Sequence, residues 1–351
     1  MVHVEITLPT TRRPSRPNVR ALAEEIGVSA MTVSRALNGH PNVSEATRDR
    51  VLKAAARHGY RPNRLARGVL TGRSGTIGVM VSPVKPFEAH VVLGIHDALV
   101  EQRYLPLLHF HSLGPSAERD TQELDYIHRL LDHRVEGLIF WPSDETVPDV
   151  YLKEVWERNV PLVAIDRHLP ETRADFSGTD DVAAGRLAAE HVIALGHRRL
   201  AHVGGEPNVS TYSDRREGFE QAVRNHGLTP DIATCRHDDG FDAAVELLTA
   251  DARPTAIFAA SDVIALGVYR AAAAAGLTVG RDLSVVGCAD LPFARDLTPP
   301  LTTIRQDPYE IGRQAVRLLL QRLAGKSPPT PQSSRLLPRL FVRKSSGEAV
   351  S

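Results

Sequence analysis

From residue 76 onward, short apolar runs alternate with segments of helical periodicity, and the alternation occurs twice. The apolar runs occupy 76–82, 105–110, 135–141 and 160–165, and then 200–205, 255–261 and 283–288. The helical patterns lie at 89–102, 118–133, 149–158, 182–195, 215–226, 241–250 and 263–275. This alternation is typical of parallel strands joined by right-handed helical crossovers. Two such sets in succession predict two α/β lobes, each built on a parallel sheet, with a cleft between them.

Polar and aromatic residues near the strand ends are the candidates for a binding site in that cleft. Open parallel sheets bind ligands beyond the carboxyl ends of their strands. The candidates at these positions are Phe87, Asp166, Arg215, Ser261, Asp262 and Asp290. Cys288 also ends an apolar strand, but no base is close in the sequence, and we expect a buried small side chain there.

The charge of the chain is unevenly distributed. Lys+Arg and Asp+Glu both number 42, yet residues 1–73 carry 13 basic and five acidic residues, a formal charge of +8. The other 278 residues therefore carry −8. A basic head on an acidic body indicates that the head, and not the body, meets a polyanion.

Three short helical patterns lie within this basic head. In 19–26 the apolar residues recur at helical spacing, Asn18 can cap the helix, and Gly27 can supply a left-handed turn. A second helix is expected over 30–37 after Ser29, and a third over 45–58 after Ser44. The apolar residues expected to face inward are Val33, Leu37, Val51, Leu52, Ala54 and Ala55. This pattern predicts a helix-turn-helix that binds DNA, and the alternative is a small helical cap without a ligand.

The second helix of such a motif enters the major groove. Arg35 can donate a bidentate pair to guanine, and Ala30 and Met31 can touch base edges. The other candidates in the head for contact with DNA, several of them suited to phosphates, are Ser29, Thr32, Ser34, Asn38, Asn42, Ser44 and Tyr60.

Residues 61–75 join the head to the body. Asn63 can cap a helix of about two turns over 64–70, which is marginal alone because nucleation is costly and Gly68 lies inside it. A basic segment with apolar side chains that folds on contact suits insertion into the minor groove. The candidates for this role are Asn63, Ala66, Arg67, Val69 and Leu70. A plain linker remains open as the alternative.

The sequence contains no constellation that is typical of an enzyme. It has no G-x-G-x-x-G, no Walker A, no H-E-x-x-H and no G-x-S-x-G. His109 and His111 could bind a metal from one strand, but no third ligand is near. We therefore expect no catalysis, no cofactor and no metal. Because no apolar run is long enough for a signal or a membrane span, we expect a cytoplasmic protein associated with the nucleoid.

The stretch VRALAEEIGVSAMTVSRALNGHPNVSEATRDRVLKAAARHGYRPNRLARGVLTGRSGTIGV is similar to the head and hinge of the LacI/GalR family of bacterial transcription regulators. In the body, VPLVAIDRHL, ALGHRRLAHVGG, DRREGFEQA, PTAIFAASDVIALGVYRA, DLSVVGC and PPLTTIRQD resemble recurrent family blocks. The resemblance runs from about residue 17 to 345. It implies the fold of periplasmic sugar-binding proteins for the body and a hinge helix over 64–70.

The resemblance also implies roles for several residues of the body. Asp166 and Arg215 would hold polar groups of an effector, Ser261 would lie beside Asp262, and Phe241 would stack on the ligand. Carboxylates, an arginine and an aromatic face suit a sugar. The chain departs from the family after its last VVG strand, where Cys288-Ala289-Asp290 replaces two consecutive acids. Either Asp290 substitutes, or the effector has fewer hydroxyls or a different charge, or there is none.

The domain organisation expected from the residues and the resemblance has five parts. They are a disordered basic tail (1–16), a helix-turn-helix domain (17–60), a hinge and linker (61–75), the effector and dimerisation body (76–345) and a tail (346–351). The two lobes are expected at about 76–178 plus 307–334 and about 179–306 plus 335–345.

The expected function is that of a homodimeric regulator, by default a repressor. It would bind a near-palindromic operator in double-stranded DNA and be controlled by a small effector, a sugar by resemblance. A non-sugar effector, a co-repressor, or a sugar-binding protein without specific DNA readout are the alternatives.

Overall fold

The computed structural model describes residues 18–37, 39–60, 73–81, 85–110, 116–142, 149–169, 174–236 and 239–349. The chain divides into two compact units, a head that ends at Ser74 and a body that begins at Gly75. Each unit has its own hydrophobic core.

The head consists of three helices, α1 (Val19–Ile26), α2 (Ala30–Leu37) and α3 (Glu45–Arg57). Asn18 caps α1 by accepting a hydrogen bond from the Ala21 amide at 2.9 Å, and Gly27 ends it with a φ of 66°. This left-handed residue makes the tight turn into α2, as the sequence predicted.

The core of the head is small and comes from all three helices. It contains Leu22, Ala23, Ile26, Val33, Ala36, Val43, Val51, Ala54 and Ala55. Two expectations need correction. Leu52 is 47% exposed because its position on α3 faces away from α1 and α2, and Leu37 is only half-buried at the rim of the core.

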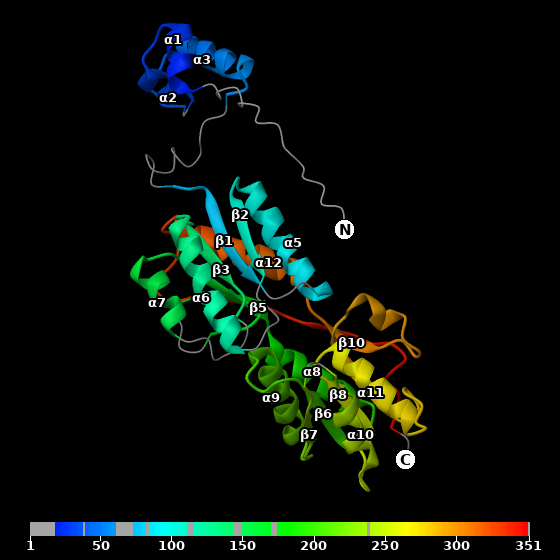
Figure 1. Ribbon diagram of the computed structural model, residues 1–351. Coiled ribbons are helices and arrows are strands. Elements are labelled where there is room, and N and C mark those ends of the chain that lie inside the picture. Colours follow the sequence, from blue (N-terminus) through cyan, green and yellow to red (C-terminus); the bar gives the residue numbers. More distant parts are fainter. Residues whose placement is uncertain are drawn as a thin grey trace, which may run out of the picture. The chain divides into compact units, whose positions relative to one another are not determined.

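The first lobe of the body, the N-lobe, contains a six-stranded parallel sheet (Figure 1). In sheet order its strands are β11 (Ser333–Leu336), β5 (Asp175–Thr179), β4 (Leu162–Ile165), β3 (Gly137–Phe140), β1 (Thr76–Val81) and β2 (Leu105–Phe110). One face packs on α5 (Pro86–Glu101) and α12 (Pro308–Leu323). The other packs on α6 (Ser116–Asp132) and α7 (Asp149–Glu157). Because both faces are covered, β1, β3 and β4 are almost wholly apolar.

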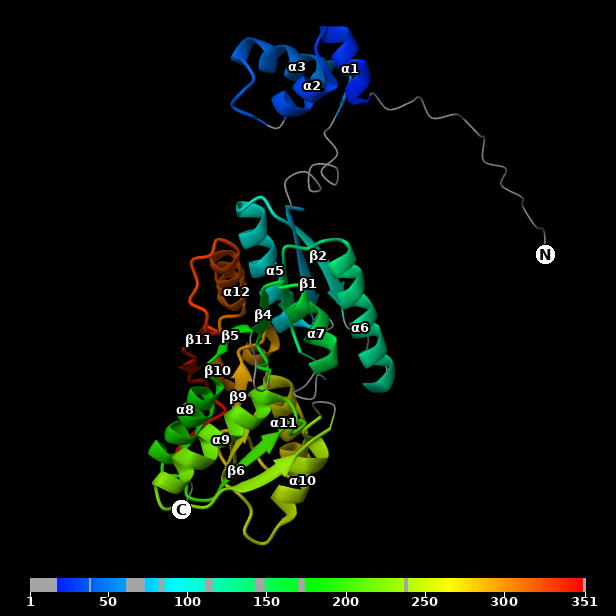
Figure 2. The ribbon, with the colours of Figure 1, turned by 90° about the vertical axis from the view of Figure 1, so that its left-hand side faces the viewer.

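The second lobe, the C-lobe, repeats this plan. Its sheet order is β12 (Arg339–Phe341), β10 (Thr302–Arg305), β9 (Ser284–Ala289), β8 (Ala256–Ala259), β6 (Leu200–Gly204) and β7 (Asp231–Thr234), with only β12 antiparallel to its neighbour. The helices α10 (Phe241–Thr249) and α11 (Asp262–Ala274) cover one face. The helices α8 (Asp181–Ala194) and α9 (Ser210–Asn225) cover the other (Figure 2). A 3₁₀ turn, η1 (Pro292–Arg295), follows β9.

The chain passes between the two lobes three times. It crosses after β5, returns after β10 to form α12 and β11, and crosses again to β12. The expected fold class, a helix-turn-helix head followed by two parallel α/β sheets, is confirmed.

Two of the expected boundaries in the body need correction. Residues 335 and 336 belong to β11, which pairs with β5 in the N-lobe sheet and not with the C-lobe. Residues 346–349 are not a tail, because Ser346 contacts His191 at 2.8 Å and the Ala349 amide donates to the Leu195 carbonyl at 2.9 Å. These hydrogen bonds hold the end of the described chain against the C-lobe.

Candidate functional site

The exposed side of α2 presents the side chains that are expected to contact DNA. Met31 is 61% exposed, and Ala30 and Arg35 are exposed beside it. Burial of Val33 and Ala36 fixes this orientation, because α2 turns its opposite side to the core of the head. An exposed methionine next to an arginine can contact both apolar and polar groups at base edges.

The predicted phosphate contacts lie near the starts of helices. The Ser29 Oγ accepts from the Thr32 amide at 3.0 Å and lies 2.9 Å from the Thr32 hydroxyl, and the Ser44 Oγ accepts from the Thr47 amide at 3.3 Å. Asn42 is exposed, Ser34 is half-buried, and Tyr60 is half-buried against the core of the head. The predicted contacts Asn38, Asn63, Ala66, Arg67, Val69 and Leu70, and the hinge helix over 64–70, lie outside the described residues.

In the body, a cavity of about 200 Å³ lies between the two lobes, where strands of both sheets end. Asp166 follows β4 of the N-lobe, while Ser261 and Cys288 come from the ends of β8 and β9 in the C-lobe. Its lining consists of Lys85, Pro86, Phe87, Glu88, Asp166, Arg167, Thr211, Tyr212, Arg215, Ser261, Val263, Cys288, Ala289, Leu291, Phe293 and Gln306. The cavity therefore lies where parallel-sheet topology places a ligand.

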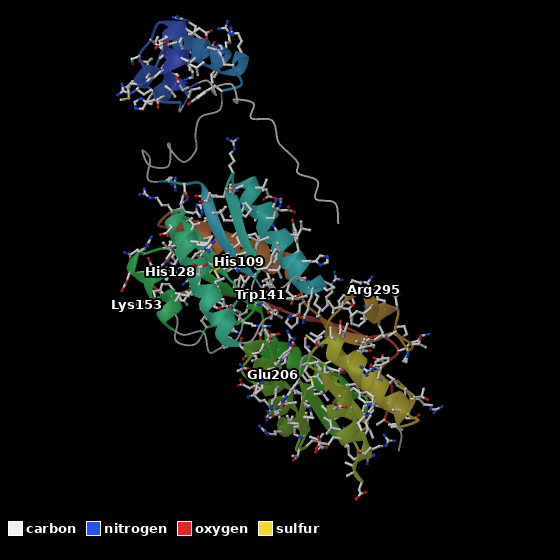
Figure 3. The ribbon with its side chains drawn as sticks, viewed as in Figure 1. His109, His128, Trp141, Lys153, Glu206 and Arg295 are labelled. Atoms are coloured by element: carbon white, nitrogen blue, oxygen red, sulfur yellow. The ribbon has the colours of Figure 1, made fainter. Side chains whose placement is uncertain are left out.

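The Asp166 carboxylate is directed to this cavity without a partner on one oxygen. The residue is buried, and within the described part of the chain its Oδ1 has no hydrogen-bond partner. Burial raises the pKa of Asp166, although Arg167 and Arg215 favour its ionised form. Asp166 has a left-handed backbone conformation (φ 61°) directly after β4. Trp141, labelled in Figure 3, follows the neighbouring strand β3. A buried acceptor without a donor is costly, so a ligand that brings a donor would stabilise this state.

Arg215 lines the same cavity, but much of its hydrogen-bonding capacity is used within the C-lobe. Its Nε donates to Asp181 Oδ1 at 2.7 Å, and its Nη1 donates to the Ala260 carbonyl at 2.8 Å. Burial alone would lower the pKa of Arg215, but the Asp181 carboxylate outweighs burial and the pKa is raised. Arg215 is therefore both a lining residue and half of a buried ion pair.

Of the seven predicted effector residues, Phe87, Asp166, Arg215 and Ser261 line the cavity, and Asp262, Asp290 and Phe241 are not part of the described lining. Ser261 also caps α11, since its Oγ accepts from the Ile264 amide at 3.1 Å. Phe241 packs against the C-lobe core, and the Arg270 guanidinium lies 4.8 Å from its ring centre. Its position at the start of α10 accounts for this placement.

The carboxylates of Asp262 and Asp290 are engaged inside the C-lobe. Asp262 is fully buried, and its two oxygens accept from the Thr303 hydroxyl at 2.6 Å and from the Leu291 amide at 2.7 Å. Asp290 accepts from Arg343 at 2.5 Å and lines a neighbouring space of about 490 Å³. Asp290 is therefore not part of the lining of the cavity of about 200 Å³, whereas Ala289 lines both spaces.

Glu88 is a lining residue that the sequence analysis missed. Within the described chain its Oε2 is buried without a hydrogen-bond partner, and burial raises the pKa of its carboxyl. It lies in the first turn of α5, which begins at Pro86, and proximity to Phe87 was the only signal in the sequence. The described residues contain no group of three or more His, Cys, Asp and Glu that could hold a metal ion. No described helix is both long and apolar enough to span a bilayer.

The buried Asp262 carboxyl should make stability depend on pH. Burial raises the pKa of Asp262 to about 6, against the effect of its two hydrogen bonds. The carboxyl loses its proton near pH 4 in the unfolded chain but only near pH 6 in the folded protein. The stabilisation that results from this difference is therefore complete below pH 4 and is lost as the pH rises through 6. Two pH units correspond to about 3 kcal/mol. We expect the free energy of unfolding of the wild type, relative to Asp262→Asn, to fall by about 2 kcal/mol of this between pH 4 and 6.5 in urea titrations followed by circular dichroism.

The control for this measurement is Asp242→Asn, at an exposed position in the first turn of α10. It is expected to keep the wild-type pH profile. Parallel profiles for Asp262→Asn and the wild type would contradict the prediction.

The head and the body each match a known protein family. Residues 19–63 match the family of bacterial regulatory proteins described as the lacI family, and residues 189–346 match the periplasmic binding protein-like domain. The chain is 31% identical over 335 residues to the HTH-type transcriptional repressor PurR of Haemophilus influenzae, covering 93% of this chain and 98% of PurR. It is 33% identical over 323 residues to the repressor CytR of Escherichia coli, covering 90% and 92%.

Solved structures give the same result. A crystal structure of the lac repressor dimer bound to operator and the anti-inducer ONPF superposes with a TM-score of 0.83 at 29% identity, covering 95% of this chain and 100% of the repressor. A complex of the transcriptional regulator CelR with cellobiose superposes with a TM-score of 0.70 at 31% identity, covering 94% and 100%. The chain therefore belongs to the lacI family of bacterial regulatory proteins.

Proposed function

We propose that this protein is a transcriptional repressor that binds a specific operator and is controlled by a small effector in the interlobe cavity. The observation that carries the proposal is the combination, in one chain, of an exposed helix face on α2 and a cavity with buried acceptors that have no partner among the described residues. Family membership supports repression as the expected direction of regulation, with the effector relieving it.

The lining of the cavity supports an effector that donates hydrogen bonds. Asp166 and Glu88 each present a carboxylate oxygen without a partner in the described chain, and Phe87 and Phe293 supply apolar surface. A sugar offers hydroxyl donors together with apolar C–H faces, so a carbohydrate is the proposed class. Ala289, where the family usually has an acid, favours a non-sugar effector as the second candidate.

The test is a pair of binding measurements on the full chain. Selection of bound fragments from the genome gives the operator, and competition with an unrelated duplex measures specificity. A thermal-shift screen of sugars, nucleosides and other small polar metabolites then identifies the effector, which should change operator affinity. Equal affinity for the operator and an unrelated duplex would contradict the proposed function as a sequence-specific repressor.

Arg35 is proposed to read one base pair. Arg35→Ala should weaken operator binding by roughly 1–3 kcal/mol and relax the preference at a single position, because a bidentate contact to guanine is lost. Fluorescence anisotropy on operators with single base changes measures both effects. The control Arg57→Ala removes an exposed arginine on α3 that pairs with Glu25 at 2.7 Å, and base preference should not change. Unchanged specificity in Arg35→Ala would show that α2 is not the reading helix.

The homodimer is proposed to form through the N-lobe. The edge strand β2 exposes three large apolar side chains, Leu105 (51%), Leu108 (43%) and Phe110 (41%), and the adjacent α5 exposes Leu93 and Val100. An apolar edge strand exposed to water is prone to pair with another chain, and a near-palindromic operator requires a two-fold symmetric dimer.

Leu108→Glu should give a monomer in analytical ultracentrifugation with strongly weakened operator binding. Val342→Glu, at an exposed apolar position in the C-lobe, is the control and should leave a dimer. A dimeric Leu108→Glu protein would place the interface elsewhere.

A further inference from the structure

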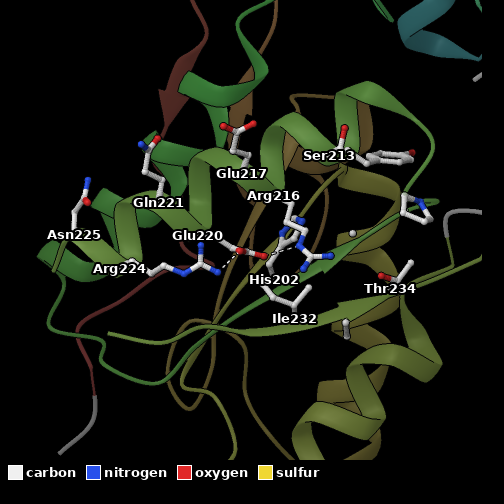
Figure 4. Close-up of a pocket in the computed structure, with 15 residues that line it drawn as sticks. His202, Ser213, Arg216, Glu217, Glu220, Gln221, Arg224, Asn225, Ile232 and Thr234 are labelled. Carbon is white, nitrogen blue, oxygen red and sulfur yellow. Dashed lines mark hydrogen bonds and ion pairs between the residues drawn. The ribbon is translucent and has the colours of Figure 1, made fainter. Parts of the chain in front are cut away.

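A second hollow lies in the C-lobe, between α9 and the strands β6 and β7 (Figure 4). Its volume is about 560 Å³, larger than the interlobe cavity. One wall is the outward side of α9, with Arg216, Glu220 and Arg224, and the floor includes His202 of β6 and Thr234 of β7. β7 is the edge of the sheet, so the hollow lies where the covering layer of helices ends.

His202 contributes an acceptor at the floor of this groove. The side chain is fully buried in a cluster with the rings of Phe219 and Phe258, which also contact each other. Its Nδ1 lies 2.9 Å from the Phe258 carbonyl, and because a carbonyl only accepts, Nδ1 must carry the proton. Burial lowers the pKa of His202 to about 4, so the ring is neutral at pH 7 and Nε2 has a free lone pair.

The Nε2 atom of His202 has no hydrogen-bond partner within the described chain. Gly204, which also lines the groove, keeps the space beside it open, since a Cβ there would lie 3.2 Å from Nε2. A buried acceptor without a donor is uncommon in a folded protein and indicates a missing partner.

Two arginines of α9 line the same groove. Glu220 is nearly buried and binds both of them, with Arg216 donating from Nε at 2.5 Å and Arg224 donating from Nη2. The side chains of Arg216 and Arg224 are 48% and 64% exposed, and each guanidinium has further N–H groups beyond those bound to Glu220. Paired guanidinium groups are the preferred protein donors for carboxylates and phosphates.

We propose that this groove is a second ligand site, for a small oxyanion that also carries a hydroxyl group. The anionic oxygens would accept from Arg216 and Arg224, and the hydroxyl would donate to His202 Nε2 after the half-exposed Arg216 side chain moves aside. Phosphate monoesters and hydroxycarboxylates share this chemistry. The site is separate from the proposed effector cavity, although Tyr212 lines both, so α9 joins the two.

The experiment uses the full chain labelled with ¹⁵N in its histidine rings, titrated at pH 7 with glycerol 3-phosphate, gluconate, sulfate and glycerol. Glycerol 3-phosphate represents the phosphate monoesters, and gluconate represents the hydroxycarboxylates. Sulfate is an anion without a carbon-bound hydroxyl group, and glycerol has hydroxyl groups but no charge. We expect one of the first two probes to bind about tenfold or more tightly than sulfate and glycerol, by calorimetry. The ¹⁵N resonance of the unprotonated His202 Nε2 should move upfield as it accepts a hydrogen bond.

The double variant Arg216→Gln/Arg224→Gln removes both guanidinium cations at exposed positions and should raise the Kd about tenfold or more. The control is Arg186→Gln on α8, which removes an exposed arginine from an i,i+4 pair with the exposed Glu190, and it should bind as the wild type does. The proposal is overturned if no probe binds, if sulfate binds as tightly as the hydroxylated anions, if the His202 resonance does not move, or if Arg186→Gln weakens binding as much as the double variant.

Discussion

Val33→Gln is expected to abolish operator binding while the body still binds its effector. Val33 is fully buried at the centre of a core of nine small and medium side chains, and glutamine would place an amide without partners there. A domain of this size has little stability to lose. We expect the head to unfold and operator affinity to fall by about a thousandfold, which is about 4 kcal/mol. Anisotropy with the operator and calorimetry with the effector measure the two halves of the prediction.

Leu52→Gln is the matched control, because it places the same side chain at an exposed position on α3. It should leave both activities close to those of the wild type. Simultaneous loss of operator and effector binding in Val33→Gln would contradict the division of the chain into two independently cored units.

Arg215→Met is expected to destabilise the C-lobe by about 3–5 kcal/mol, because it leaves the Asp181 carboxylate buried without its partner. The same change removes a cation from the lining of the interlobe cavity, so effector binding should also be lost. Urea titration gives the stability and calorimetry gives the effector affinity.

The double variant Arg215→Met/Asp181→Asn separates these two effects. With no buried charge left unpaired, most of the stability should return. Effector binding should stay weak, since Asp181 is not part of the described lining and Arg215 is. A double variant that is stable and binds the effector as tightly as the wild type would show that Arg215 acts only as a partner for Asp181.

Periodicity predicted the parts of the fold in which apolar residues recur regularly. The helices of the head and the strands β1, β3, β4, β6, β8 and β9 were expected within a few residues, because each buries a continuous apolar run or stripe. The strands that were missed are β5, β7, β10, β11 and β12, with the sequences DFSGT, DIAT, TTIR, SSRL and RLF. Their polar residues are paired through tertiary contacts, such as Ser177, whose hydroxyl donates to the Ile311 carbonyl at 2.8 Å.

The lining of the interlobe cavity was only partly predictable, for a related reason. Strand-end reasoning found Asp166 and Ser261, but it could not distinguish a carboxylate that faces the cavity from one bound inside the lobe. Asp262 and Asp290 are bound by Thr303 and Arg343, residues 41 and 53 positions away. Glu88 was missed because a single acid in the first turn of a helix resembles an ordinary helix-start residue.

The threefold passage of the chain between the lobes has a consequence for biosynthesis. The helix α12 and the strand β11, which complete the N-lobe, are encoded after almost all of the C-lobe. During translation, the N-lobe segment up to β5 therefore cannot complete its fold until α12 and β11 have been synthesised near the end of the chain. The head, in contrast, is synthesised first and as one continuous segment. A premature stop before residue 308 would leave the sheet face that α12 covers open to water, and such a fragment should be removed by proteolysis although most of the polypeptide is present.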